Sequence, residues 1–96
     1  MSTKEAYQQR MADELQLARA KLAEFKAQAK RSMADVRIKF NKQITELERD
    51  IEATKMKLQE LESASEPAWD KLKTGVENAW DSVSASVRDI AAKFKS

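Results

Sequence analysis

The sequence predicts an all-helical protein, and two observations carry that prediction: the residue composition and the spacing of the apolar residues. Among 96 residues there is one glycine and one proline, whereas alanine, lysine, glutamate and leucine are abundant. Such a mixture has high helix propensity and supplies turn residues for a single reversal of the chain. We therefore expect one small helical unit over residues 1–96, with a limited core.

The first predicted helix covers about residues 3–62. From Tyr7 to Leu61 an apolar or small residue recurs at sixteen positions, spaced 3.6 residues apart on average. This is the period of a straight α-helix, whereas a strict heptad repeat averages 3.5 and supercoils. A helix of this length spans roughly 90 Å, and another helix must cover its apolar stripe. Three apolar residues lie off the stripe and mark either a second contact face or ordinary scattered exposure: Leu17, Ile38 and Met56.

The stripe is interrupted at residues 63–67, the turn or kink of the prediction. Pro67 is unfavourable inside a helix, but it is well tolerated in the first turn of a new helix for which Ser65 serves as N-cap. The apolar stripes before and after Pro67 are in phase. A continuous kinked rod is therefore the alternative to a helical hairpin, and the hairpin is favoured.

The second predicted helix is amphipathic and covers about residues 67–94, with Phe94 closing its apolar face. At roughly 40 Å it covers only the distal half of the first helix, which leaves the stripe over residues 5–35 open. An antiparallel dimer with a coiled-coil-like bundle would close it. The predicted self-association face comprises Tyr7, Met11, Leu15, Leu22 and Phe25. Within the hairpin, Leu47, Ile51, Leu58 and Leu61 are expected to pack against Trp69, Leu72, Val76 and Trp80.

The residue inventory argues against an enzyme. Histidine and cysteine are absent, so the usual general bases, thiol nucleophiles and soft metal ligands are missing. We expect no catalytic residue, no cofactor, no metal and no small-molecule substrate. The N-terminal residues lack the apolar core of a signal peptide, and no stretch approaches the roughly 20 apolar residues of a membrane span. A cytoplasmic location is the default expectation.

Two surface features suggest alternative partners. Residues 19–42 carry a net charge of +6 and residues 43–62 a net charge of −3, so a nucleic-acid-associated rod is a weak alternative. Around Trp69 and Trp80 the triplet Ala-Trp-Asp recurs after 11 residues. Two tryptophans on one face suit either a helix–helix core, which is favoured, or a lipid surface that an apolipoprotein-like chain reaches by opening its hairpin.

The chain resembles a family of short bacterial coiled-coil proteins associated with stress responses, after a light-stress-responsive cyanobacterial representative. The resemblance rests on the opening Ser2-Thr3-Lys4-Glu5-Ala6-Tyr7, on the long charged helix, and on Ala68-Trp69-Asp70-Lys71-Leu72-Lys73-Thr74-Gly75-Val76-Glu77-Asn78-Ala79-Trp80-Asp81. It implies a stress-linked, non-catalytic role and assigns no active-site residue. From all these observations we expect a self-associating helical protein, with lipid binding as the main alternative.

Overall fold

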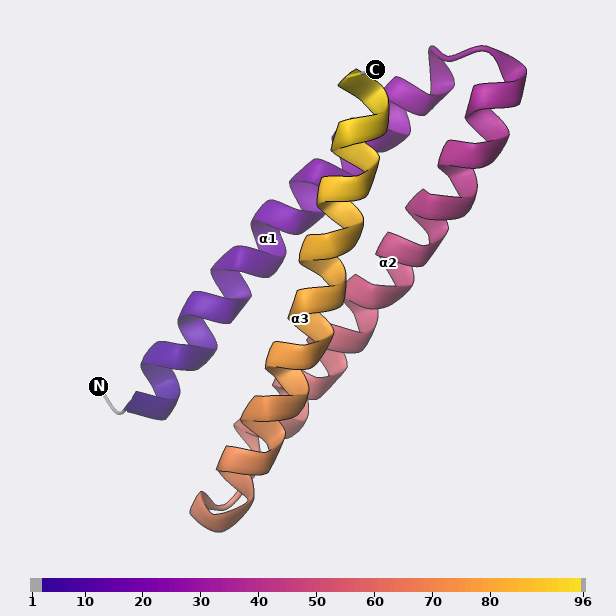
Figure 1. The fold of residues 1–96 in the computed structure, drawn as a ribbon. Helices are drawn as coiled ribbons and strands as arrows, with labels where there is room; N and C mark the ends of the chain where they lie inside the picture. The colour runs from indigo at the N-terminus through magenta and orange to yellow at the C-terminus, as the bar shows by residue number, and fades with distance from the viewer. Residues whose placement is uncertain (1–2, 96) are drawn as a thin grey trace.

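A computed structural model describes the backbone of residues 3–95 and the side chains of residues 3–93, and this part of the chain forms a bundle of three helices (Figure 1). The helices are α1 (Thr3–Lys30), α2 (Ala34–Glu62) and α3 (Glu66–Lys95). Helices α1 and α3 run in one direction and α2 runs in the other, in a rod with extents of 50 × 20 × 18 Å. The prediction of an all-helical fold is confirmed. Phe94 lies outside the described side chains.

The prediction of one straight helix over residues 3–62 is wrong, because the chain reverses at residues 31–33. There the Ser32 Oγ donates a hydrogen bond to the Gln28 carbonyl oxygen over 3.0 Å. Met33 then adopts an extended conformation, with φ −63° and ψ 154°, directly before α2. The reversal brings α1 back along its own chain, so that the apolar stripe is covered without a second molecule. A straight 3–62 helix leaves half of that stripe in water, at a cost that grows with the exposed apolar area.

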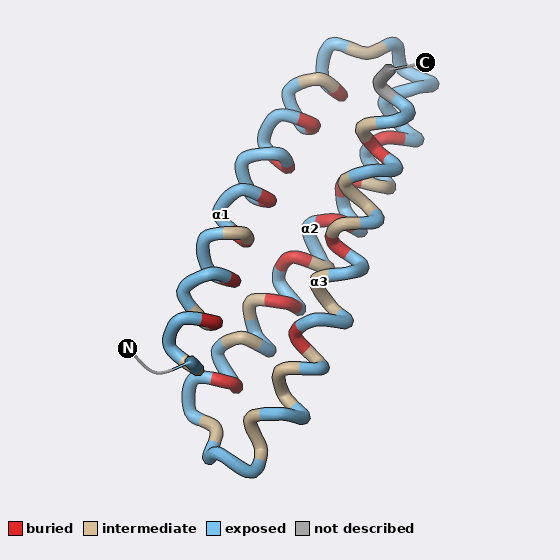
Figure 2. The backbone as a smooth tube through the Cα atoms, turned by 60° about the vertical axis from the view of Figure 1, so that its left-hand side comes forward, coloured by how far each residue is buried: buried red, intermediate tan, exposed pale blue. Residues whose placement is uncertain are grey.

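The buried residues follow the predicted stripe. On α1 they face α2 and α3, as the red positions in Figure 2 show. The stripe fails at the turn, where Met33 and Val36 are exposed although the spacing places them in line with buried neighbours. Buried side chains on α1 are Tyr7, Met11, Leu15, Ala18, Leu22, Phe25 and Ala29; on α2, Phe40, Ile44, Leu47, Ile51, Thr54 and Leu61; on α3, Val76, Val83 and Ile90.

The second reversal, between α2 and α3, is the hairpin that Pro67 predicts, and the kinked rod does not form. Helix α3 begins at Glu66, so Pro67 lies in its first turn, where a missing backbone N–H is tolerated. The Ser65 carbonyl oxygen accepts a hydrogen bond from the Trp69 N–H over 3.0 Å. Ser65 therefore occupies the N-cap position of α3, as the sequence predicts.

Candidate interaction surfaces

The residues predicted to form the self-association face lie inside the chain's own core. Tyr7, Met11, Leu15, Leu22 and Phe25 are all buried by α2 and α3 of the same molecule. The prediction assumed that nothing within the chain covers this part of the stripe. Because the turn at residues 31–33 folds α1 back onto the hairpin, these five side chains belong to the core and are not a surface of the folded chain.

The residues predicted to pack within the hairpin fall into two adjoining apolar clusters. The first contains Leu47 and Ile51 with Val83 and Ile90 and extends toward the C-terminal half of α3. The second joins Tyr7 and Met11 of α1 to the hairpin near its turn. Leu58 and Trp80 pack against both clusters and so connect them. The second cluster also holds Leu61 and Val76, with Trp69 and Leu72 packed against it.

An aromatic pair joins α1 to α3 close to the hairpin turn. The rings of Tyr7 and Trp69 meet edge to face, with centroids 5.9 Å apart and planes at 73°. The Lys73 Nζ lies 5.2 Å from the Tyr7 ring centroid and 5.1 Å from that of Trp69, which is cation–π geometry. Burial, and next the negative charge of Glu77, raise the pKa of the Tyr7 phenol above its ordinary value. The Trp69 ring is therefore half-buried and makes its contacts with side chains of α1 and α3.

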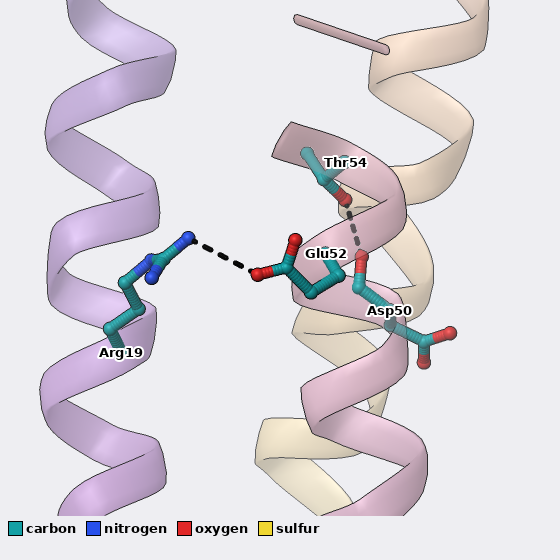
Figure 3. A network of polar contacts seen from close by, with 4 residues as sticks. All are labelled: Arg19, Asp50, Glu52 and Thr54. Carbon is teal, nitrogen blue, oxygen red and sulfur yellow. Dashed lines mark hydrogen bonds and ion pairs between the residues drawn. The ribbon is translucent and has the colours of Figure 1, made fainter. Parts of the chain in front are cut away.

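Ion pairs hold the side of the bundle where α1 faces α2. The Lys26 Nζ lies 2.6 Å from a carboxylate oxygen of Glu48. The Arg19 guanidinium reaches across to Glu52 over 3.8 Å (Figure 3). All four side chains are about half exposed, so each pair contributes little stability, roughly 0.2–1 kcal/mol. Their main effect is to place opposite charges of α1 and α2 in register.

Two polar residues of α2 have structural roles. Thr54 is buried within the apolar stripe, and its hydroxyl donates to the Asp50 carbonyl oxygen over 2.9 Å, as Figure 3 shows. This bond satisfies a hydroxyl that would otherwise be costly to bury. The Asp50 carboxylate accepts a 3.3 Å hydrogen bond from the Ser86 hydroxyl of α3. Among the described residues, no group of three or more acidic side chains converges closely enough to hold a metal ion.

Opposite the ion pairs, the side between α1 and α3 is open. Both helices pack along α2, but they share few contacts with each other. The result is a groove of about 510 Å³ with an apolar middle and charged ends. Leu17 stands at its edge with 69% of its surface exposed. The groove is lined by Glu14, Leu17, Ala18 and Lys21 of α1 and by Trp80, Val83, Ser84, Val87 and Arg88 of α3.

The sequence alone does not predict this groove, although Leu17 stands out in it as an apolar residue off the stripe. Leu17 by itself does not distinguish a contact surface from ordinary exposure. The distinguishing fact is that α3 lies alongside it, and this depends on the reversal at residues 31–33.

Comparison with protein-family models, with curated proteins and with solved structures finds no match to this chain. The resemblance to the stress-response family therefore stays a prediction. Within the described residues, none of the three helices is long and apolar enough to cross a membrane.

Proposed function

We propose that this chain is a non-catalytic, self-associating helical-bundle protein, and that two copies join antiparallel through the groove between α1 and α3. The proposal rests on a row of charged residues on α1 that is centred on Leu17. Residues at similar distances on the two sides of Leu17 carry opposite charges, so the row is complementary to a second copy of itself that lies antiparallel. The proposal retains the antiparallel dimer that the sequence predicts, but it places the interface on the open side of the bundle and not on the buried stripe.

The row consists of five residues spaced three or four apart, so that they share one face of α1. Their order is Arg10, Glu14, Leu17, Lys21 and Glu24. When two α1 helices cross antiparallel at Leu17, Arg10 faces Glu24 of the second copy. Likewise Glu14 faces Lys21 of the second copy. A parallel contact places each residue beside its own counterpart and so brings like charges together, which disfavours that orientation.

Helix α3 contributes a matching pattern on the other side of the groove. A two-fold axis that passes near Leu17 also passes near Ser84, because the groove aligns these parts of α1 and α3. Trp80 then faces Arg88 of the second copy, an arrangement that suits a cation–π contact. The small side chain of Ser84 at the centre permits close approach. An isologous contact of this kind covers the apolar middle of the groove on both copies.

The remaining parts of the proposal rest on the sequence. The lack of histidine and cysteine supports a role without catalysis. The resemblance to stress-response proteins supports a stress-linked role, and a cytoplasmic location remains the default. Self-association is the part for which the geometry of the groove provides direct support.

A charge placed at the centre of the groove tests the proposal. Leu17→Glu brings two carboxylates together at the two-fold axis, and we expect sedimentation equilibrium to show a shift from dimer to monomer. Met56→Glu is the matched control, because Met56 is 60% exposed but lies on α2, away from the groove. This control should remain dimeric. A wild-type chain that is monomeric, or two variants with equal association, would contradict the proposal.

A further inference from the structure

The end of the rod at the α1–α2 turn exposes an unusual run of residues. Every residue from Met33 to Lys39 is exposed, which covers about two turns of chain at the start of α2. Three of the exposed residues are large and apolar. Met33 has 82% of its surface exposed and Ile38 70%, and Val36 is exposed as well. Val36 and Ile38 are two residues apart and so face different sides of α2, which together with Met33 gives this end of the rod apolar side chains in several directions.

The same end concentrates positive charge. Residues 30–42, here termed the tip, contain five basic residues and one acidic residue, Asp35. No carboxylate among the described residues forms an ion pair with any of the five. Elsewhere in residues 19–42, Arg19 and Lys26 pair with glutamates of α2, and Lys21 lies 3.6 Å from Glu24 of its own helix. The five basic residues of the tip are Lys30, Arg31, Arg37, Lys39 and Lys42.

We propose that the tip docks on the surface of an anionic phospholipid bilayer. Met33, Val36 and Ile38 enter the boundary between headgroups and acyl chains, while the basic side chains meet the lipid phosphates. Each half of this arrangement matches one property of the bilayer: its interface accepts apolar side chains, and its negative surface attracts lysine and arginine. The bundle binds end-on and stays closed. This inference does not depend on the proposed dimer.

A nucleic-acid partner explains less of the same surface. A phosphate backbone attracts the basic residues but gains nothing from exposed Met33 and Ile38. Single-stranded nucleic acid stacks on aromatic side chains, and the aromatic residue of the tip, Phe40, is buried. The lipid surface accounts for both the charge and the exposed apolar residues.

End-on docking differs measurably from opening of the bundle. Trp69 lies beside the hairpin turn, at the opposite end from the tip, and Trp80 lies farther along α3, where it lines the groove. Docking through the tip leaves both tryptophans in their protein environment. Opening of the helices onto lipid instead transfers them to the bilayer interface and changes their emission.

Flotation with vesicles of equal parts phosphatidylglycerol and phosphatidylcholine tests the proposal. The wild-type chain should float with these vesicles, with unchanged tryptophan emission, and should not float with phosphatidylcholine alone. The triple variant Met33→Ser, Val36→Ser, Ile38→Ser should lose at least about tenfold in partitioning. The control variant Met56→Ser removes an exposed apolar side chain outside both the tip and the groove, and should float like the wild type.

A second pair of variants tests the charges. Lys30→Gln, Arg31→Gln and Lys39→Gln together should lower partitioning at least about tenfold, because each basic residue near an anionic surface contributes about fivefold. Arg37 is left in place because it donates a hydrogen bond to the Ser32 carbonyl oxygen. The control variant removes three exposed charges elsewhere and should bind normally: Arg49→Gln, Lys57→Gln and Lys71→Gln.

Several results overturn the proposal. Wild-type protein that stays at the bottom with anionic vesicles contradicts it, and so does a serine triple variant that floats as well as the wild type. If both tip variants still float and the tryptophan emission shifts, the chain binds lipid through helices that have opened. If the chain binds duplex DNA but does not float with vesicles, the basic residues of the tip bind nucleic acid and not lipid. Thermal melts of each variant establish that the bundle is still folded.

Discussion

The two turns of the bundle have the same length but contrasting surroundings. Each contains three residues, 31–33 and 63–65. At the second turn, the Lys4 Nζ donates to the carbonyl oxygen of Ala64 over 2.9 Å and to that of Glu62 over 3.3 Å. At the first turn, Met33 takes the N-cap position of α2 but makes no side-chain capping bond.

This difference agrees with the proposal that the end opposite the hairpin turn is the one that binds. The hairpin turn is tied to α1 by hydrogen bonds and by the nearby aromatic pair of Tyr7 and Trp69. The other turn forgoes a polar cap, which typically stabilises a helix by about 1 kcal/mol. In its place it presents Met33 and Ile38 to solvent. Exposed apolar residues in place of a stabilising cap fit the proposed lipid contact.

The largest expected contrast comes from truncating one apolar side chain at each end. Leu61→Ala should lower the free energy of unfolding by about 2–5 kcal/mol, because Leu61 is fully buried in the cluster near the hairpin turn. Met33→Ala should change it by less than about 0.5 kcal/mol, since Met33 is exposed. Urea unfolding followed by circular dichroism measures both. Equal losses at the two ends would show that the contrast is wrong.

A smaller effect of opposite sign is expected from giving the first turn a polar cap. Met33 already has the extended backbone that an N-cap residue requires, so Met33→Asp should raise the free energy of unfolding by about 1 kcal/mol. The same substitution should weaken vesicle binding, because it replaces an apolar side chain of the tip with a negative charge. Thermal melts and flotation of one preparation test both effects. A variant that is less stable, or that binds vesicles more tightly, goes against this account.

The smallest effect at neutral pH concerns Tyr7, whose buried hydroxyl has no hydrogen-bond partner. Tyr7→Phe should not lower the free energy of unfolding and should raise it by no more than about 1 kcal/mol, because it removes a buried hydroxyl that makes no bond in the folded chain. At alkaline pH the two chains should differ. The folded chain retains the phenol proton after the unfolded chain loses it, so this contribution to stability is complete below the ordinary pKa of 10.0 and is lost as the pH rises past it.

Unfolding midpoints measured across this alkaline range test the Tyr7 prediction. The wild-type midpoint should fall more steeply than that of Tyr7→Phe above pH 10.0, since phenylalanine cannot ionise. The two chains differ by the phenol hydroxyl alone, so the difference between the two profiles isolates its contribution. Parallel profiles would mean that the pKa of Tyr7 is not raised in the folded chain.

The sequence predicts which residues form the core better than it predicts where the chain reverses direction. The 3.6-residue spacing identifies all seven buried positions of α1, from Tyr7 to Ala29. Pro67, with Ser65 before it, marks the hairpin. These features follow from local rules, the helical period and the restricted backbone of proline, so a single sequence reveals them.

The turn at residues 31–33 leaves no comparable local signal. It contains neither glycine nor proline, and the apolar spacing continues in phase from Ala29 through Met33 to Phe40. A continuous helix and a reversal therefore look alike in the pattern. What separates them is the apolar area that α1 buries when it folds back, a tertiary effect. The groove beside Leu17 depends on that reversal and is equally hidden.

The central proposal is an antiparallel contact through the groove, and mixing two charge-reversed variants tests it most directly. In Glu14→Lys alone, lysines at positions 14 and 21 of the two copies face each other, and in Lys21→Glu alone glutamates do. A dimer that contains one copy of each variant pairs lysine with glutamate at both contacts. The effect of a substitution within its own helix is the same in this mixed dimer as in a dimer of identical copies, so it does not favour either one. With one variant isotopically labelled, native mass spectrometry should show each variant associating more weakly than the wild type and the mixture forming predominantly mixed dimers. Variants that dimerise alone as well as the wild type, or a mixture with no preference for the mixed dimer, would contradict the account.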